Sequence, residues 1–458
     1  MGPAGRENST GRPSRPGNDP IAIPGRESCF RLAPMRVLVL TALMLASALP
    51  PVRSSRPLTD PDVAMIEVAG EGANYWPRWR GPSGQGVVSG TGYVDRWSPT
   101  ENVKWKTKLD ATGNGSPIVW GNRIFLVTAG SGGERRGVAA FDRTDGKKLW
   151  ETYAPDVSAE TVYPKNGYAS STPATDGRLV YAYLGAHGVL ALDFNGKQAW
   201  HKPVGAIQAS HGSAGSPLLY KDRVIIFQDQ DGGGFIKAFD AKTGAERWST
   251  PRAEQVGWGT PIAIRAGNRD EIIVSSMRKV YAYNPDTGAV LWTAGGSLFE
   301  VIPTPVAGHG LVFASSGRSG PTLAIRPGGS GDVTATHVVW KEAKGSPFVP
   351  SPLLYGEELY LINDMASIAT AYDAKTGTVR WQGRLGTAAR EGFSASPVGV
   401  DGKVFFTNDA GDTFVLQAGK EFKLLHVNSL GERVLASPAL VDGTWYYRTH
   451  EHLIAIGK

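Results

Sequence analysis

A pattern of short apolar runs separated by polar turns repeats along most of the chain. One complete unit extends from Ser216 to Trp248. It opens with Ser-Pro, continues through three β-branched or aromatic runs, and reaches a turn that contains Gly244. A fourth run then ends at the tryptophan. Apolar runs of this length and composition, bounded by turn residues, are typical of strands, so each unit is predicted to form a four-stranded antiparallel sheet.

Three columns of residues show that the unit recurs. Ser/Thr-Pro opens each unit, at Ser116, Thr172, Ser216, Thr260, Thr304, Ser351, Ser396 and Ser437. Glycine stands four residues before a tryptophan in five units, and small side chains align at Ala140, Ala191, Ala238, Ala282, Ala324, Ala371 and Ala455. Glycine tolerates positive φ, alanine lets a neighbouring sheet approach, and tryptophan can cover the seam between sheets. Such sheets are expected to stack radially as a β-propeller.

The two ends of the repeat region complement each other. The eighth unit ends after its third strand, at 452–456, and lacks a tryptophan strand. A tryptophan strand without a unit of its own, at 102–107, precedes the first Ser-Pro. We therefore predict an all-β protein, an eight-bladed β-propeller of four-stranded antiparallel blades whose N-terminal strand closes the last blade.

The repeat has a family resemblance. Ala-Phe-Asp-Ala-Lys-Thr-Gly-Ala-Glu-Arg-Trp at 238–248, echoed at 282–292 and 371–381, resembles the repeat of pyrroloquinoline-quinone (PQQ) propellers. That superfamily includes quinoprotein alcohol dehydrogenases and the outer-membrane assembly factor BamB. The resemblance covers 102–458 and implies the fold more than an activity. Residues 76–86 also resemble a run that precedes the propeller in secreted BamB-like proteins.

The segments before the propeller suggest export. Residues 1–34 are rich in Gly, Pro, Ser and Arg and are expected to be a disordered leader or a mis-annotated start. From Met35 a basic start, an apolar run and small residues match a signal peptide over 35–56; the alternative is a short buried segment after a disordered tail. Residues 57–101 contain Trp76, Trp79 and Trp97. We expect this Trp-rich strap to lie against the propeller without a ligand role.

Charge and cysteine content limit the kinds of partner and chemistry that we expect for this protein. Residues 1–56 hold eight arginines and three acids, which leaves 40 basic and 39 acidic residues elsewhere and argues against nucleic acid. The single cysteine, Cys29, precedes the expected cleavage site, so we expect no disulfide, no thiolate chemistry and no lipid anchor. The mature protein is expected to be periplasmic or secreted, not a lipoprotein, without a transmembrane segment, and monomeric because a closed ring leaves few strand edges.

Candidate functional residues fall on one face of the predicted ring. We call it the loop face, because it carries the loops between blades and the hairpins between the second and third strands of each blade. The opposite turn face carries uniform turns. Variable loops on a rigid scaffold commonly hold binding sites. The predicted ligand- or partner-binding residues are His211, Trp258, Glu300, Arg318, Asp364, Glu391, Asp409 and Arg433.

Two functions are compatible with this pattern. The first is an exported, non-catalytic scaffold, without catalytic or metal-binding residues, that binds an envelope protein or an extracytoplasmic ligand as the BamB resemblance implies. The alternative is a PQQ- and Ca²⁺-dependent dehydrogenase or a degenerate PQQ binder. For this alternative, the resemblance implies a cofactor at the axis, and the residues of this chain that could hold it are Glu300 or Glu391 together with Trp258. The chain lacks the vicinal cysteine pair and the long insertions of those dehydrogenases.

Overall fold

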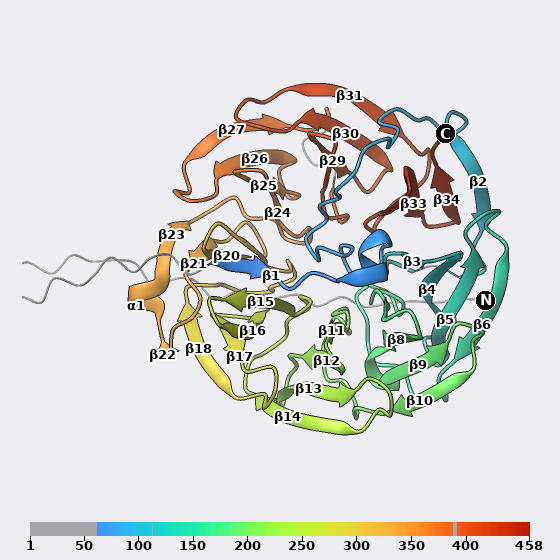
Figure 1. Ribbon diagram of the computed structural model, residues 1–458, viewed down its shortest axis with the longest axis horizontal. Coiled ribbons are helices and arrows are strands. Elements are labelled where there is room, and N and C mark those ends of the chain that lie inside the picture. Colours follow the sequence, from blue (N-terminus) through green and yellow to red (C-terminus); the bar gives the residue numbers. More distant parts are fainter. Residues whose placement is uncertain (1–61, 112, 388–391) are drawn as a thin grey trace, which may run out of the picture. The chain divides into compact units, whose positions relative to one another are not determined.

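Eight sheets follow one another around a central axis (Figure 1). The structure is a computed structural model that describes residues 62–111, 113–387 and 392–458. Each blade contains four antiparallel strands, and its sheet has these four strands alone except in the fourth blade, where β1 (Val63–Met65) and β22 (Gly331–Asp332) add to the two edges. The first strand of each repeat lies on the side of the axis. First strands of neighbouring blades contact one another, among them those of the second and third, the fifth and sixth, and the eighth and first blades in chain order. The predicted eight-bladed, all-β propeller is therefore confirmed.

The blades are numbered in chain order, and their strands are given from the axis outward. Blades 1 to 4 consist of β3 (Ile118–Trp120), β4 (Arg123–Ala129), β5 (Arg136–Asp142) and β6 (Lys148–Tyr153); β7 (Ala174–Thr175), β8 (Leu179–Tyr183), β9 (Val189–Asp193) and β10 (Gln198–Lys202); β11 (Leu218–Tyr220), β12 (Arg223–Gln228), β13 (Gly234–Asp240) and β14 (Glu246–Arg252); and β15 (Ile262–Ala266), β16 (Arg269–Ser275), β17 (Lys279–Tyr283) and β18 (Val290–Gly295). Blades 5 to 8 consist of β19 (Val306–Gly308), β20 (Leu311–Ser315), β21 (Thr322–Ile325) and β23 (Val338–Glu342); β24 (Leu353–Tyr355), β25 (Glu358–Asn363), β26 (Ile368–Asp373) and β27 (Val379–Arg384); β28 (Val398–Val400), β29 (Lys403–Thr407), β30 (Asp412–Gln417) and β31 (Leu424–Ser429); and β32 (Ala439–Val441), β33 (Thr444–Arg448), β34 (His452–Ile456) and β2 (Val103–Lys108).

The ring closes through its two ends, as predicted. Strand β2 pairs antiparallel with β34, with Trp105 opposite Ala455. The N-terminal strand thus supplies the outermost strand of blade 8, and the C-terminal segment supplies the other three. Closure removes the strand edges that an open stack of sheets would expose.

The tryptophan, glycine and alanine columns form the seams between blades. Trp200 of blade 2 donates its Nε1–H to the carbonyl of Ala241 in blade 3, at 2.9 Å. A Cβ added to Gly244 would lie 2.7 Å from the Trp200 ring, and Gly244 has φ +70°. Glycine is therefore needed at this turn for both its conformation and its lack of a side chain. The same tryptophan-to-carbonyl bond is made by Trp105, Trp150, Trp248, Trp340 and Trp381.

Blade 4 uses a different seam because blade 5 lacks the Asp-x-x-x-Gly turn. Trp292 is fully buried and donates to the carboxylate of buried Glu271, at 2.8 Å. An inserted segment covers it: β22 (Gly331–Asp332) pairs parallel with β18, and α1 (Thr334–His337) follows. The remaining helical pieces are the 3-10 turns η1 (Gly70–Asn74) and η2 (Gly185–His187). No helix in the described ranges is long and apolar enough to cross a membrane.

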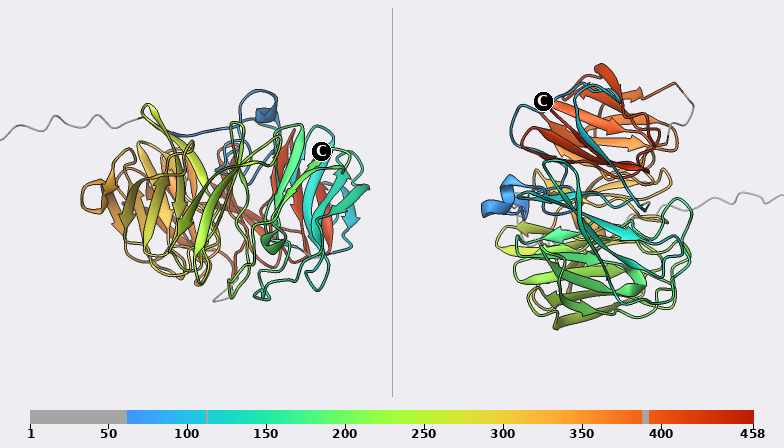
Figure 2. Two further views of the ribbon diagram at one scale, coloured as in Figure 1. Left: turned by 90° about the horizontal axis from the view of Figure 1, so that it is seen from below. Right: turned by 90° about the vertical axis from the view of Figure 1, so that its right-hand side faces the viewer.

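Residues 62–101, which we call the strap, contact the propeller from its turn face (Figure 2). Strand β1 (Val63–Met65) adds to the inner edge of blade 4 by pairing with β15. Trp76 forms a β-bridge with Val119 in blade 1, and Val87 forms one with Gly399 in blade 7. The strap therefore ties together blades that are not neighbours in the ring.

Candidate functional site

The serine and threonine that open each blade form a hydrogen-bonded belt around the axis. The Ser216 backbone N–H donates to Thr260 Oγ1 at 3.1 Å, and the Thr260 N–H donates to Thr304 Oγ1 at 3.1 Å. The same bond links each blade to the next from blade 1 to blade 8, with donor–acceptor distances of 2.9–3.1 Å. Each acceptor hydroxyl keeps its own hydrogen, which it can donate toward the axis.

A cavity of about 300 Å³ lies at the axis beside this belt. Belt hydroxyls line part of its wall, and Trp79 of the strap lines it as well. Trp79 donates its Nε1–H to Thr304 Oγ1 at 3.2 Å, so the strap closes the axis on the turn-face side. Tyr163 and Arg318 line the opposite side, and both are exposed on the loop face. The site is therefore a cup that opens on the loop face.

Aromatic side chains form one wall of the cup. The Trp258 and His211 rings form a T-shaped pair with centroids 5.6 Å apart, and the Tyr163 ring centroid lies 5.3 Å from that of His211. Trp258 donates its Nε1–H to the Gly212 carbonyl at 2.8 Å, which fixes the plane of its ring. A wall of this kind offers apolar faces with a few polar edges, as small-molecule and peptide sites usually do.

An ion pair stands at the mouth of the cup. Glu300, in the loop that precedes blade 5, is bound in a fork by Arg318 from the β20–β21 hairpin; Arg318 Nη2 lies 2.8 Å from Glu300 Oε1. The Arg318 guanidinium also lies over the ring of Phe348, 5.4 Å from its centroid. The carboxylate is engaged by a cation of its own chain, while the exposed guanidinium faces solvent.

Two further acidic residues of the predicted set, Asp409 and Asp364, lie near the rim of the cup. Asp409 forms an ion pair of 2.8 Å with Lys165, which lines the cup. Asp364 is buried and accepts the backbone N–H of Phe348 at 2.6 Å. Burial raises the pKa of Asp364, although this hydrogen bond acts in the opposite direction. Its carboxylate fixes the loop that carries Phe348 and does not reach the cavity lining.

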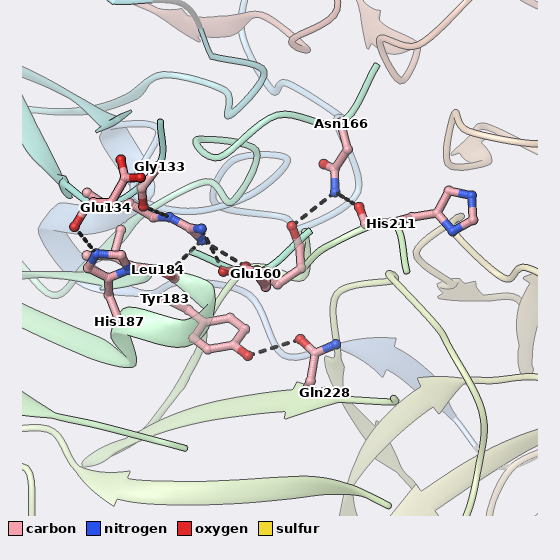
Figure 3. A network of polar contacts seen from close by, with 11 residues as sticks. Gly133, Glu134, Glu160, Asn166, Tyr183, Leu184, His187, His211 and Gln228 are labelled. Carbon is pink, nitrogen blue, oxygen red and sulfur yellow. Dashed lines mark hydrogen bonds and ion pairs between the residues drawn. The ribbon is translucent and has the colours of Figure 1, made fainter. Parts of the chain in front are cut away.

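The residues 154–171, which we call the arch, connect blades 1 and 2 and bring Tyr163 and Lys165 to the cup. A buried ion pair anchors this segment: Arg136 donates to both oxygens of Glu160, at 2.9 and 2.6 Å. Asn166 holds the far end by donating to the His211 carbonyl at 2.7 Å (Figure 3). Burial alone would raise the pKa of Glu160, but the Arg136 guanidinium more than offsets this and holds that pKa below its ordinary value.

The structure brings together half of the predicted face residues. His211, Trp258, Glu300 and Arg318 line one cavity. Asp409 lies outside the lining but pairs with Lys165, which belongs to it, and Asp364 is buried outside the lining. Arg433 is exposed on the loop face and does not line the cup; its carbonyl accepts the backbone N–H of His450. Glu391 lies outside the described residues.

Sequence reasoning missed two parts of the cup. It used Ser/Thr-Pro only as the mark that opens each unit and gave the hydroxyl before the proline no role. The signal was available, because all eight positions carry Ser or Thr. It also gave the strap no part in a site, whereas Trp79 lines the cavity. No periodic signal marks Trp79, since the strap lies outside the repeat.

The donors around the cup do not fit PQQ with Ca²⁺. Calcium in proteins takes six to eight oxygen ligands, usually with several carboxylates. Among the described residues that line the cup, Glu300 carries the only carboxylate, and Arg318 occupies both of its oxygens. In the described ranges, no three His, Cys, Asp or Glu side chains are grouped so that they could hold a metal ion. The Trp258 ring is held by its hydrogen bond to Gly212 and packs against His211.

Comparisons with known proteins agree with the repeat and the fold. The family model described as "Outer membrane protein assembly factor BamB" matches residues 83–230, 138–382, 276–423 and 364–456. Tetrathionate hydrolase of Acidithiobacillus ferrooxidans is 24% identical over 67% of this chain and 66% of its own, so this chain spans just under two thirds of that relative. BamB of Yersinia pestis is 24% identical over 63% of this chain and 71% of its own. A quinohemoprotein alcohol dehydrogenase of Pseudomonas putida HK5 superposes with a TM-score of 0.59 at 14% identity, covering 86% of this chain and 82% of its own, which shows the shared fold.

Proposed function

Because the chain belongs to the PQQ-like β-propeller family whose model is described as outer membrane protein assembly factor BamB, we propose that it is a non-catalytic scaffold of the cell envelope. It binds an envelope protein or another extracytoplasmic ligand through the loop face. Export by the signal peptide at 35–56 is part of this proposal. The envelope assignment is supported by the name of the BamB relative, which is an outer-membrane assembly factor.

The observation that carries the proposal is the cup itself. It opens on the loop face, is closed by the strap on the other side, and offers aromatic walls and hydroxyl donors. Among the described lining residues the one carboxylate, that of Glu300, is held by Arg318, and the His211 imidazole lies 2.8 Å from Ser210 Oγ through its Nδ1. General base catalysis needs a group with a free acceptor within hydrogen-bonding reach. With Glu300 engaged by Arg318 and His211 bonded to Ser210 instead of a carboxylate, this lining supports binding better than chemistry.

A quinoprotein function is the second candidate, because a quinohemoprotein dehydrogenase shares the fold. In that case the protein would bind PQQ at the axis with Ca²⁺. Glu300 would have to leave Arg318 to become a metal ligand, and the described lining offers it no second carboxylate. The donor set therefore supports the scaffold over this candidate.

One titration separates the two functions. The protein is titrated with PQQ in the presence and absence of Ca²⁺, and tryptophan fluorescence is recorded, because Trp79 and Trp258 line the cup. The scaffold function predicts no saturable, Ca²⁺-dependent quenching. Saturation at micromolar PQQ that is lost in Glu300→Gln would overturn the scaffold proposal and establish the quinoprotein.

Partner binding is tested by site-specific crosslinking. A photoreactive residue in place of Arg433, which is exposed on the loop face outside the cup, is compared with one at Arg178 on the turn face. The scaffold function predicts crosslinks to an envelope component from the first position and none from the second. Equal crosslinking from both positions would contradict binding through the loop face.

A further inference from the structure

Exposed apolar side chains gather on one sector of the loop face, formed by the loops of blades 4 to 6 and the tip of the arch. Leu298, Phe299, Tyr163 and Met365 are all large and exposed, and Phe299 has the greatest exposure of them at 62%. Other exposed large apolar side chains in the described ranges lie mostly on the outermost strands, scattered around the rim. Clustering of this kind marks an interaction site, whereas single exposed apolar residues are ordinary.

Loop contacts hold these apolar residues around Arg318. The Leu298 backbone N–H donates to Ser316 Oγ at 3.1 Å, next to the hairpin that carries Arg318. The adjoining Ser319 accepts a hydrogen bond of 2.7 Å from Asn363, at the base of the turn that carries Met365. Glu300, the residue after Phe299, is bound by Arg318. The sector is thus one connected surface beside the mouth of the cup.

The charge that this surface presents to solvent is positive. In the Arg318–Glu300 pair the cation is 58% exposed and the carboxylate 26%, and in the Arg278–Glu254 pair the values are 65% and 11%. Lys344, beside Ser319 in the loop between blades 5 and 6, is exposed as well. The carboxylates lie beneath their cations, so an approaching molecule meets guanidinium and ammonium groups first. Acidic groups complement such a surface.

Backbone conformation singles out the same sector. Arg278, Glu300, Arg318, Ser319 and Ser367 have φ of +53° to +66°, a region that costs a non-glycine residue about 1–2 kcal/mol. In the described part of the chain, no other loop-face residue apart from glycine has a positive φ. Backbone strain concentrates where function requires particular side chains in particular directions. Here it coincides with the exposed cations and apolar groups.

We propose that the blade 4–6 sector of the loop face docks an extended polypeptide segment in which apolar side chains alternate with carboxylates. This inference rests on the proposed scaffold function and names the chemistry of the partner. The apolar side chains of the segment cover Leu298, Phe299 and Met365, and one of them enters the mouth of the cup beside Tyr163. Its carboxylates meet Arg318 and Arg278. A projecting strand or chain end can reach a recessed cup between hairpin tips, which a flat protein surface cannot.

The test uses fluorescence anisotropy with three short fluorescein-labelled peptides. In the first, Phe and Leu alternate with Glu; in the second, Lys replaces each Glu; in the third, Ser replaces each Phe and Leu. The protein variants are Phe299→Ser, Leu298→Ser and Arg318→Glu. Leu149→Ser, on the outermost strand of blade 1, and Arg178→Glu, on the turn face, make the same changes at exposed positions elsewhere. Thermal unfolding confirms that each variant is folded.

The proposal predicts saturable binding of the Glu peptide alone to the unaltered protein. Phe299→Ser and Leu298→Ser should each weaken it about tenfold, as truncation of an interfacial anchor does, and the matched controls should leave it unchanged. Arg318→Glu should weaken the Glu peptide and strengthen the Lys peptide. Equal binding of the Glu and Lys peptides, or equal losses in the sector variants and their controls, would overturn the proposal.

The result is separable from the proposed function. If crosslinking from the Arg433 position captures an envelope component equally well in the Phe299→Ser variant, the scaffold function stands and this sector is wrong. If PQQ binds with Ca²⁺ dependence, the scaffold function itself fails, whatever the peptides show.

Discussion

The buried Arg136–Glu160 pair should be among the most costly polar contacts to break, because it anchors the arch. Its side chains are 1% and 2% exposed. Glu160 accepts two bonds from Arg136 and one of 3.1 Å from Ser213. Arg136 also donates to the carbonyls of Gly133 and Leu184, at 3.0 and 3.1 Å. Every bond of the pair is internal, so water cannot replace a missing partner.

The structure sets the expected magnitude. Arg136→Met leaves a buried carboxylate with only the Ser213 hydroxyl, and removing one partner of a buried ion pair costs about 3–5 kcal/mol. Glu160→Gln leaves a buried guanidinium with neutral acceptors only, the carbonyls of Gly133 and Leu184 and the amide oxygen of the new side chain, and its cost should lie at the lower end of this range. In the double variant neither charge is unpaired, so its loss should be smaller than the sum of the single losses by at least about 1 kcal/mol. The matched change Glu246→Gln breaks an ion pair with Lys237 on the surface and should cost about 0–1 kcal/mol.

Urea unfolding at pH 7, followed by tryptophan fluorescence, measures all four variants. Hydrogen exchange of residues 154–171 provides a local readout, because the arch should open more often once its anchor is lost. Single losses below about 1 kcal/mol, or strict additivity in the double variant, would refute the idea that the pair acts as an anchor. Loss of stability with unchanged exchange in the arch would show that the pair stabilises the seam between blades instead.

Three further outcomes follow from the same contacts. The pKa of Glu160 is held below its ordinary 4.5 in the folded protein. The stability that its ionised form contributes is therefore complete above pH 4.5 and is lost as the pH falls through the pKa of the folded state. Urea midpoints measured from pH 7 to pH 3 should fall less steeply in Glu160→Gln than in the unaltered protein. Gly377→Ala should destabilise more than Gly121→Ala, since both have positive φ but only the first Cβ would strike a tryptophan ring, at 2.7 Å; equal urea midpoints would contradict this. Thr304→Val removes the acceptor of a belt N–H and of Trp79 Nε1 and should cost about 1–3 kcal/mol, whereas Thr304→Ser should retain most of the stability in the same assay.

The fold could be predicted because its determinants are local and repeated. A turn that needs positive φ, such as that of Gly244, restricts the residue type at one position in five units, and the tryptophan that follows it restricts another. Five copies of this turn, within eight units that open with Ser/Thr-Pro, make such a constraint visible without any knowledge of long-range contacts. Closure was also readable, because a strand missing from one end was present at the other. The exceptional seam of blade 4 was not, since burial of Glu271 beneath Trp292 depends on an insertion in the next blade.

The candidate site was only partly predictable, because its geometry depends on which loop tips meet. Repeat spacing places His211, Trp258 and Glu300 in the loops that precede their blades, and these residues do line one cavity. Repeat spacing also assigns Asp364 to the loop face, on the hairpin between β25 and β26. Its carboxylate nevertheless accepts the backbone N–H of Phe348 and does not line the cavity. Spacing assigns a residue to a face, but packing of neighbouring loops decides whether its side chain points to the axis. Lys165 reaches the cup only because the arch crosses it, which no repeat encodes.

The strap determines from which side the cup can be reached. Arg80 is buried and donates to the carbonyls of Pro352 and Pro397, the belt prolines of blades 6 and 7. Burial lowers the pKa of Arg80 to about 9, yet the group stays charged at neutral pH and holds both carbonyls. With Trp79 bound to Thr304 of the belt, the strap is fixed to three blades at the level of the cup floor. Access to the axis is therefore left to the loop face, where the exposed cations and apolar side chains of blades 4 to 6 stand beside the mouth of the cup.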